Sequence, residues 1–472
     1  MKAPAPPACL YPRQAVSACR TLEGGGENVN EEVMKSIHEK MMAVILLMLL
    51  LLTVASQAHA AGGTDVDDDS GLPSDSLLAI DLRREGEVFT AGNNVTLLMT
   101  GQQKFDDLFA AIRQARHSVH LEYFNFRNDS IAMLLFDILA AKAAEGVKVR
   151  ALYDAFGNSS NNQPLRRKHI SELRARGIDI HEFDPIRFPW INHIFGRDHR
   201  KIVVIDGQIA YTGGMNVADY YITGTPAVGA WRDMHCRLEG PEVDTLQKIF
   251  FRAWKKVTGE DIGTEGYFNG KTPRYEYNGL RENGADTADR MLCATINREP
   301  HRSPKAVRQF YYHAISDAKD TIRLINPYLT LIPKIRRALT DAVERGVTVQ
   351  IMVAEPSDIP LTPDCVFYNC NKLQKKGCQI WVYKPGFHHT KVIMVDGRYC
   401  TVGSTNLDAR SLKCDYEVNL AILDKNITRQ LTDMFERDKK DSFYLADGVY
   451  KQWRTPWQRF RGWFAHLLSP FL

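Results

Sequence analysis

The sequence lacks the patterns that mark the common metal and nucleotide sites. None of its nine cysteines forms a C-x-x-C pair, so no zinc framework is indicated, and free thiols are favoured over a bridge among Cys365, Cys370 and Cys378. It has no H-E-x-x-H motif. The segment GYFNGKT (266–272) comes near to a phosphate-loop motif, but only three residues separate its glycines where that motif needs four. We therefore expect neither a metal nor a cofactor in the reaction.

Strong charge of one sign is also missing. The formal net charge is +4 over 472 residues, with 25% charged and 44% hydrophobic residues. That composition is typical of a globular protein and excludes a disordered or fibrous one. The charge neither demands nor excludes an anionic partner. The length is too great for one ordinary core and predicts two domains of similar size.

The chain has no apolar run of the usual membrane-spanning length. Its longest run, residues 41–55, would span about 22 Å as a helix, short of the roughly 30 Å of a hydrocarbon core. A lysine-containing head that starts at Met34 precedes the run, and Ala-His-Ala at 58–60 follows it. This pattern favours a secretory signal peptide over an anchor, with translation starting at Met34. We expect residues 1–60 to be a leader that sends the chain to a membrane or across it.

From residue 90 the apolar pattern alternates regularly between strands and helices. The first part predicts, in order, a strand at 94–101, a helix at 104–117, a strand at 118–126, a helix at 129–146 and a strand at 147–154. The second part repeats the order with segments 306–320, 321–329, 332–346, 347–353 and 378–386. Such units imply a parallel or mixed sheet covered by helices. The expected boundaries are a linker at 61–89, domains at 90–257 and 300–448, a linker or excursion at 258–299, and a tail at 449–472.

One polar pattern occurs twice. HRKIVVIDGQIAYTGGMN covers residues 199–216, and HTKVIMVDGRYCTVGSTN covers residues 389–406. The shared polar residues all recur at one constant offset and are His199/His389, Lys201/Lys391, Asp206/Asp396 and Asn216/Asn406. A single copy could be a strand end with solvated charges. Two copies at a constant offset make coincidence negligible and indicate a duplicated unit.

The residue types of the repeated pattern suit a phosphate group. Histidine and lysine two positions apart on a strand project from the same face. The small residues before the asparagine let the backbone approach a ligand closely. Each copy therefore offers an imidazole that can attack phosphorus or carry a proton, a fixed positive charge, and an amide donor.

The pattern H-x-K-x(4)-D-x(6)-G-[GS]-x-N, present twice, resembles the signature of the phospholipase D superfamily. Flanking segments such as HLEYFNFRND, WRDMHCRLEGPEV, GSTNLDARS and YEVNL are similar to bacterial cardiolipin synthases, and this similarity runs over residues 92–472. The resemblance implies an α/β fold of two similar domains, each a mixed β-sheet flanked by helices, packed as a pseudo-dimer around one active site. It further implies a phosphatidyltransferase of the bacterial cell membrane that converts two phosphatidylglycerol molecules into cardiolipin and glycerol.

By this resemblance, His199 is the nucleophile that forms a phosphohistidine, and His389 is the general acid and later the general base. The symmetry of the motifs leaves the reverse assignment open. The resemblance also implies a set of residues around the phosphate, namely Lys201, Lys391, Asn216, Asn406 and Ser404.

Four carboxylates are candidates for orienting the histidines. Asp206 and Asp396 complete the motifs and are counted with the catalytic set, although each could instead cap the turn that follows its strand. The family points to Asp233 and Glu417 as the orienting residues. Which carboxylate serves which histidine stays open.

Three further positions are noted beside the motifs. Glu122 either lines the pocket or is a strand-end charge. His388 is expected to point to the face opposite His389. Gly214 stands where the second copy has Ser404, so the hydroxyl is present on one side only.

The closing segment WRTPWQRFRGWFAHLLSPFL predicts an amphipathic helix that begins at Pro456 with Thr455 as its N-cap. Its apolar stripe contains Trp457, Phe460, Phe464, Leu467, Leu468 and Phe471. The stripe either lies in a membrane interface or packs on the core of the protein.

The expected partners are phospholipid substrates and a membrane surface, without nucleic acid and without a required oligomer. A phospholipase D that hydrolyses phospholipids is the alternative activity. A nuclease of the same superfamily is less favoured, since no basic stripe is evident.

Overall fold

The computed structural model describes residues 72–186, 195–263, 265–268, 275–277, 291–359 and 362–468. The expected leader and Phe471 lie outside the described residues. Residues Asp69–Leu472 form one unit. Within the described ranges, no helix is both long and apolar enough to cross a bilayer. The seven cysteines of these ranges are all free thiols.

The two halves of the chain build one sheet with matching strand orders. The first half supplies β1 (Phe89–Leu98), β2 (Ser118–Tyr123), β3 (Lys148–Asp154), β4 (Asp179–Phe183), β5 (Ile202–Ile205), β6 (Ile209–Gly213) and β8 (His235–Glu239). The second half supplies β10 (Met291–Arg298), β11 (Thr321–Ile325), β12 (Thr348–Ala354), β13 (Gln379–Tyr383), β15 (Val392–Val395), β16 (Tyr399–Gly403), β17 (Glu417–Leu423) and β18 (Ser442–Tyr444). From the middle outward, the orders are β1-β8-β6-β5-β2-β3-β4 and β10-β17-β16-β15-β11-β12-β13-β18.

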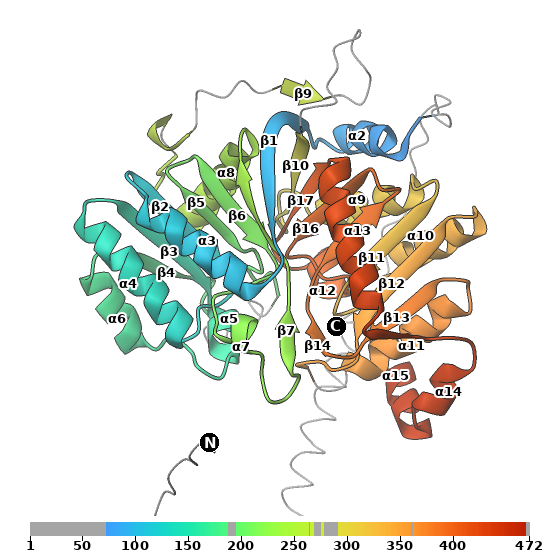
Figure 1. The fold of residues 1–472 in the computed structure, drawn as a ribbon. Helices are drawn as coiled ribbons and strands as arrows, with labels where there is room; N and C mark the ends of the chain where they lie inside the picture. Colours follow the sequence, from blue (N-terminus) through green and yellow to red (C-terminus); the bar gives the residue numbers. More distant parts are fainter. Residues whose placement is uncertain are drawn as a thin grey trace, which may run out of the picture. The chain divides into compact units, whose positions relative to one another are not determined.

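The two half-sheets meet in the middle, where β1 and β10 pair antiparallel (Figure 1). The first part of β1 pairs with β10 and with β9 (Tyr275–Tyr277), while its second part pairs with β8. An irregularity between Ala91 and Asn93 separates the two parts. Each half is a mixed sheet, since β2-β3-β4 and β11-β12-β13 run parallel and the strands nearer the middle run antiparallel.

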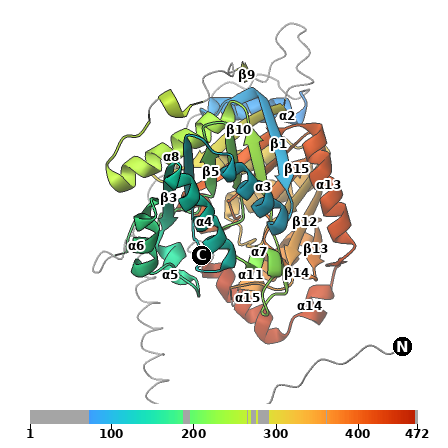
Figure 2. The same ribbon diagram turned by 60° about the vertical axis from the view of Figure 1, so that its left-hand side comes forward.

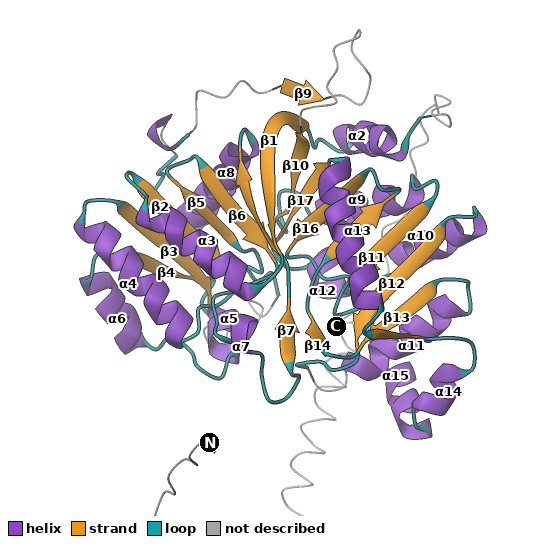
Figure 3. Ribbon diagram, in the orientation of Figure 1, coloured by secondary structure: helices purple, strands orange, loops and turns teal. Residues whose placement is uncertain are grey.

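Helices cover both faces of the sheet (Figure 3). They are α2 (Ser74–Arg84), α3 (Gly101–Arg113), α4 (Ser130–Ala144), α5 (Ala155–Ser160), α6 (Arg167–Ala175), α7 (Tyr220–Thr223), α8 (Glu242–Thr258), α9 (Ala306–Ser316), α10 (Pro333–Glu344), α11 (Thr362–Gln374), α12 (Ala409–Lys413), α13 (Lys425–Lys439), α14 (Val449–Trp453) and α15 (Pro456–Leu468), with a 3₁₀ turn at Glu265–Tyr267.

Three apolar clusters hold the layers together. One contains α3, α4 and α6 on the first half, and a second contains α2, α9, α10 and α11 on the second half. The third joins the halves, because it combines side chains of α8 and α13 with strands of both half-sheets. Two similar α/β domains packed as a pseudo-dimer, as the sequence predicts, are therefore what the structure contains.

The expected linkers contain regular structure that the sequence pattern concealed. Residues 74–84 of the predicted linker 61–89 form α2, whose Leu78 and Leu82 are completely buried against the second half. The end of the predicted excursion 258–299 is β10, a strand in the middle of the sheet. Helix α2 is polar on most of its surface and buries few large apolar residues, so its composition resembles that of a loop.

Candidate active site

The two motifs place their histidines at matching points of the two halves. His199 precedes β5, and its backbone N–H donates to the carbonyl of Tyr416 at 3.0 Å. His389 precedes β15, and its backbone N–H donates to the carbonyl of Arg232 at 2.7 Å. In each case the partner residue belongs to the other half of the chain. The second of these contacts extends the parallel pair of β14 (Gly386–His388) and β7 (Ala230–Arg232), visible side by side in Figure 1.

This backbone pairing gives each histidine a carboxylate from the opposite half. Glu417 follows Tyr416, and its Oε1 lies 3.0 Å from Nδ1 of His199. Asp233 follows Arg232, and its Oδ2 lies 2.7 Å from Nδ1 of His389. When Nδ1–H donates to the carboxylate, Nε2 is left as the nitrogen that can act on a substrate. The question of which carboxylate serves which histidine is answered by this exchange between the halves.

The two lysines of the motifs lie buried at the same place. Lys201 Nζ donates to the carbonyl of His199 at 2.6 Å, and Lys391 Nζ donates to that of His389 at 2.5 Å. Burial, together with the positive charge of Lys391, lowers the pKa of Lys201 to about 7. Burial lowers the pKa of Lys391 to about 8. Two desolvated ammonium groups, close enough for Lys391 to lower the pKa of Lys201, favour the binding of an anion, which would raise their pKa values.

The carboxylates differ in their protonation. Burial raises the pKa of Glu417 to about 7, against the opposing effect of Lys201. Burial alone would raise the pKa of Asp233 too, but Lys391 and His389 together hold it below its usual value. Asp233 is thus ionised at neutral pH, whereas Glu417 is close to its titration midpoint.

Burial and the neighbouring charged groups also shift the pKa values of the two histidines. Burial, followed by the positive charges of Lys201 and Lys391, holds the pKa of His199 well below its usual value. The pKa of His389 is also lowered by burial and by Lys391, while Asp233 acts in the opposite direction through its charge and its hydrogen bond. Asp233 therefore partly offsets the lowering at His389, whose pKa still stays below its usual value.

The amide groups of the two motifs are buried. Asn216 and Asn406 are 5% and 6% exposed, and the Oδ1 atom of each is buried without a hydrogen-bond partner among the described residues. An unpaired amide oxygen can only accept, so its missing partner is a donor such as a headgroup hydroxyl, whereas Nδ2 is the atom that can donate to a phosphate oxygen. Ser404 donates its hydroxyl to Glu417.

The missing hydroxyl at Gly214 has a steric reason. A Cβ atom at Gly214 would lie 2.2 Å from Oδ1 of Asp233. In the first half, the absence of a side chain at Gly214 makes room for the Asp233 carboxylate. In the second half, the equivalent position holds the Ser404 hydroxyl, which donates to Glu417.

Asp206 and Asp396 require a correction. Each has φ of 53° at the turn after its strand. Asp206 accepts three backbone N–H groups, those of residues 116–118, at 2.7–2.8 Å, and Asp396 accepts those of residues 319–321 at 2.8–2.9 Å. A strand of four residues separates each from its motif lysine. These carboxylates hold a loop to the end of a strand, which favours the turn-capping alternative over the expected catalytic role.

Glu122 and His388 lie outside the pocket. Glu122 is completely buried and pairs with Nε of Arg200 at 2.7 Å, so it is neither a pocket group nor an exposed strand end. His388 lies 3.1 Å from Oδ2 of Asp438 on α13.

An aromatic wall around His389 was not apparent in the sequence. Trp231, Phe387 and Tyr328 have ring centroids 5.5, 5.3 and 5.7 Å from that of His389. Phe124 lies 5.1 Å from the His199 ring. The wall draws on three separate segments, so no spacing in the chain could have indicated it.

Known proteins are similar to this chain in sequence and in fold. The model of the family described as "Cardiolipin synthase, PLD-like domain" matches residues 108–254 and 311–439. The chain is 35% identical to a probable cardiolipin synthase of Bacillus subtilis over 80% of this chain and 72% of that protein. It is 32% identical to a cardiolipin synthase of Oceanobacillus iheyensis over 84% of this chain and 79% of the relative.

A solved structure supports the fold independently. The phosphatidylserine synthase of Haemophilus influenzae matches with a TM-score of 0.62 at 14% identity, covering 84% of this chain and all of that one. At this identity the likeness shows a shared fold. The family match over two regions and the relatives of 35% and 32% identity establish that the chain belongs to the cardiolipin synthase family of phospholipase D-like proteins.

Proposed function

We propose that the protein is a phosphatidyltransferase that makes cardiolipin and glycerol from two molecules of phosphatidylglycerol. The observation that carries this proposal is the pair of histidine–carboxylate contacts, His199–Glu417 and His389–Asp233, around two buried lysines. Two imidazoles allow a two-step exchange at phosphorus, which one alone does not.

In the first step, Nε2 of His199 attacks the phosphorus of phosphatidylglycerol. The bond from phosphorus to the headgroup oxygen breaks, and His389 gives its Nε2 proton to that oxygen, which leaves as glycerol. Lys201 and Lys391, with the amides of Asn216 and Asn406, neutralise and bind the non-bridging oxygens.

In the second step, His389 takes a proton from a hydroxyl of a second phosphatidylglycerol. That oxygen attacks the phosphorus, the bond to His199 breaks, and cardiolipin leaves. One phosphodiester replaces another, so this exchange needs no nucleotide to drive it.

The surroundings of the histidines support their assignment. A nucleophile must be neutral, and two lysines disfavour the positive form of His199. A general acid must carry a proton, and the ionised Asp233 supports that form of His389.

The activity is tested with the full chain in vesicles that contain phosphatidylglycerol. We expect equimolar cardiolipin and glycerol, and neither product from the His199→Ala variant. Phosphatidic acid in place of cardiolipin would show that water is the acceptor and would contradict the proposal.

We further propose that α15 holds the enzyme at the membrane surface. The helix packs along α11 (Figure 2), where Gly462 permits contact: a Cβ there would lie 2.3 Å from the carbonyl oxygen of Asp364. Arg461 pairs with Asp364 at 2.6 Å on the same side. The protein-facing side of α15 is thus small or charged.

The opposite side of α15 is apolar and exposed. Its exposed side chains are Trp457, Phe460, Trp463, Phe464 and Leu467, and Trp457 reaches 63% exposure. These exposures favour a membrane interface over packing on the core of the protein, the other expectation for this stripe. An apolar face with tryptophan and flanking arginine suits an anionic lipid interface.

Sedimentation with phosphatidylglycerol vesicles tests this attachment. The triple variant Trp457→Ala, Phe460→Ala, Leu467→Ala should lose most of its vesicle binding. Leu134→Ala, which removes a 43% exposed leucine from α4, serves as the control and should bind like the parent. Equal binding by all three proteins would contradict the role of α15.

A further inference from the structure

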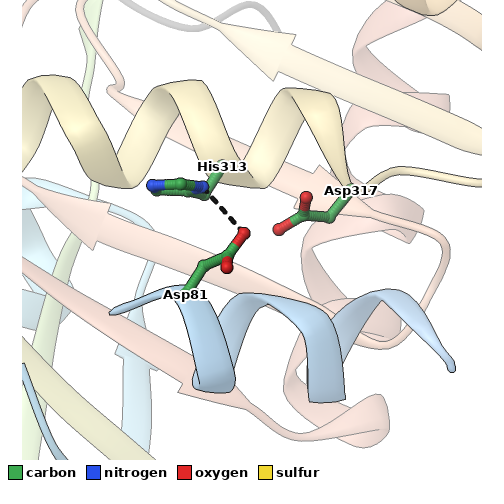
Figure 4. Close-up of side chains that lie close together, drawn as sticks. All are labelled: Asp81, His313 and Asp317. Carbon is green, nitrogen blue, oxygen red and sulfur yellow. Dashed lines mark ion pairs between the residues drawn. The ribbon is translucent and has the colours of Figure 1, made fainter. Parts of the chain in front are cut away.

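Away from the active site, α2 and α9 bring three metal-ligating side chains together. Asp81 belongs to α2, His313 to α9, and Asp317 follows the last residue of α9. One ligand atom from each residue lies within 4.8 Å of the other two. Figure 4 shows the three side chains facing one another between the two helices.

The contacts within this cluster leave two potential metal-ligand atoms without a hydrogen bond. Nδ1 of His313 lies 2.9 Å from Oδ2 of Asp81, and Oδ1 of Asp81 accepts from Arg84 at 3.0 Å. Oδ2 of Asp317 is buried and has no hydrogen-bond partner among the described residues. Nε2 of His313 has none either, although Oε1 of Glu85 lies 3.9 Å from it. Such atoms are rare in folded proteins and indicate a missing partner.

The charge of the cluster also favours a cation. Asp81 and Asp317 bring two carboxylates within 4.8 Å of each other, where like charges repel. A divalent cation between the two carboxylates would replace this repulsion with attraction to both.

We propose that Asp81, His313 and Asp317 bind a zinc ion that fastens α2 to α9. One imidazole and two carboxylates form a ligand set typical of zinc, whereas magnesium prefers oxygen ligands alone. Tetrahedral zinc ligands lie about 3.4 Å apart when the bonds are about 2.0–2.1 Å. The distances between ligand atoms in the cluster run from 2.9 Å to at most 4.8 Å, a range that includes this spacing. Small side-chain rotations therefore suffice to bring the three ligands around a zinc ion.

The site would strengthen the attachment of the first described helix. Asp75 at the start of α2 already pairs with Arg398 at 2.6 Å. A metal at Asp81 would add a second link at the other end of the helix. This role is structural and separate from the proposed reaction at the histidine pair.

Zinc binding to the full-length protein in detergent tests the site after removal of metals with a chelator. Calorimetric titration should show about one zinc ion per chain and a raised melting temperature. Asp317→Asn should weaken binding at least tenfold and remove the rise in melting temperature, while cardiolipin synthesis is retained because the shape of the side chain is kept. The control is His181→Gln, which alters a pair with Asp179 at 2.7 Å outside the cluster.

Unchanged zinc binding in Asp317→Asn would overturn the proposal and would assign the ion to other ligands, such as the active-site histidines. The absence of zinc binding to the parent protein would overturn it as well. Magnesium binding as tight as zinc binding would contradict the role of His313 as a metal ligand.

Discussion

The half-site around His199 and the half-site around His389 share a backbone but differ in their chemistry. The backbone N–H of each histidine donates to a carbonyl in the other half of the chain. The residue that follows this carbonyl supplies the carboxylate beside the imidazole. On one side that residue is Glu417, with a pKa raised by burial to about 7 and a hydroxyl bond from Ser404. On the other side it is Asp233, which stays ionised. In the proposed reaction, one copy of the duplicated unit supplies the nucleophile and the other supplies the proton carrier.

The largest effect should come from the carboxylates. Asp233→Asn removes the charge that stabilises protonated His389, and we expect kcat to fall about 10³-fold. Glu417→Gln should cost about 10–10² in kcat, since Glu417 is already partly protonated at neutral pH. Steady-state cardiolipin synthesis measures both. Equal losses of kcat in the two variants would contradict the proposed difference between the half-sites.

The next effect concerns the glycine that makes the halves unequal. Gly214→Ser would give the first half the residue of the second, but its side chain would meet the Asp233 carboxylate. We expect a loss of roughly 10² in kcat, since displacement of a positioning group that orients a catalytic histidine has that size. The reciprocal change, Ser404→Gly, removes a hydroxyl without a clash and should cost less than tenfold. A milder effect of Gly214→Ser than of Ser404→Gly would contradict this account.

A smaller effect appears in the pH dependence. Glu417 must be ionised to accept the Nδ1 proton of His199, so kcat/KM should fall as the pH drops through about 7. Ser404 lowers the pKa of Glu417 by its hydrogen bond. Ser404→Ala should therefore move this acidic limb to higher pH. A pH profile of Ser404→Ala that coincides with that of the parent protein would show that Glu417 is not the group that titrates.

The smallest effect on catalysis should come from Asp206 and Asp396. Asp206→Asn removes a carboxylate that accepts three backbone N–H groups, and we expect a loss of about 1–3 kcal/mol in the free energy of unfolding. Asp396→Asn should behave alike, because its contacts are equivalent. In both variants kcat per folded enzyme should be unchanged, as measured by denaturant unfolding together with activity. A drop in kcat without a change in stability would return these residues to the catalytic set.

The sequence was sufficient for most of the fold because its strands and helices have clear apolar periods. The predicted helix at 129–146, for example, is α4 at Ser130–Ala144. Helix α2 was missed because it buries few large apolar residues, and β10 because it follows a long polar stretch. Both gain their stability from distant parts of the chain.

The sequence predicted the site residues that lie close together in the chain. The repeated motif identified His199, Lys201, His389 and Lys391, all of which the structure brings together. The pairing of Glu417 with His199 was not predictable, since it depends on a contact between halves. Asp206 was misjudged because its place in the motif suggests chemistry, whereas its side chain serves backbone amides.

The central claim, that the two histidines are unequal, is tested most directly by trapping the covalent intermediate. His389→Ala enzyme is incubated with a phosphatidyl ester whose leaving group needs no proton, such as p-nitrophenol, and the adduct is mapped by mass spectrometry after rapid quenching. The account predicts a phosphatidyl group on His199 and no adduct in the His199→Ala variant. An adduct on His389 in the His199→Ala variant, with none on His199 in the His389→Ala variant, would contradict it.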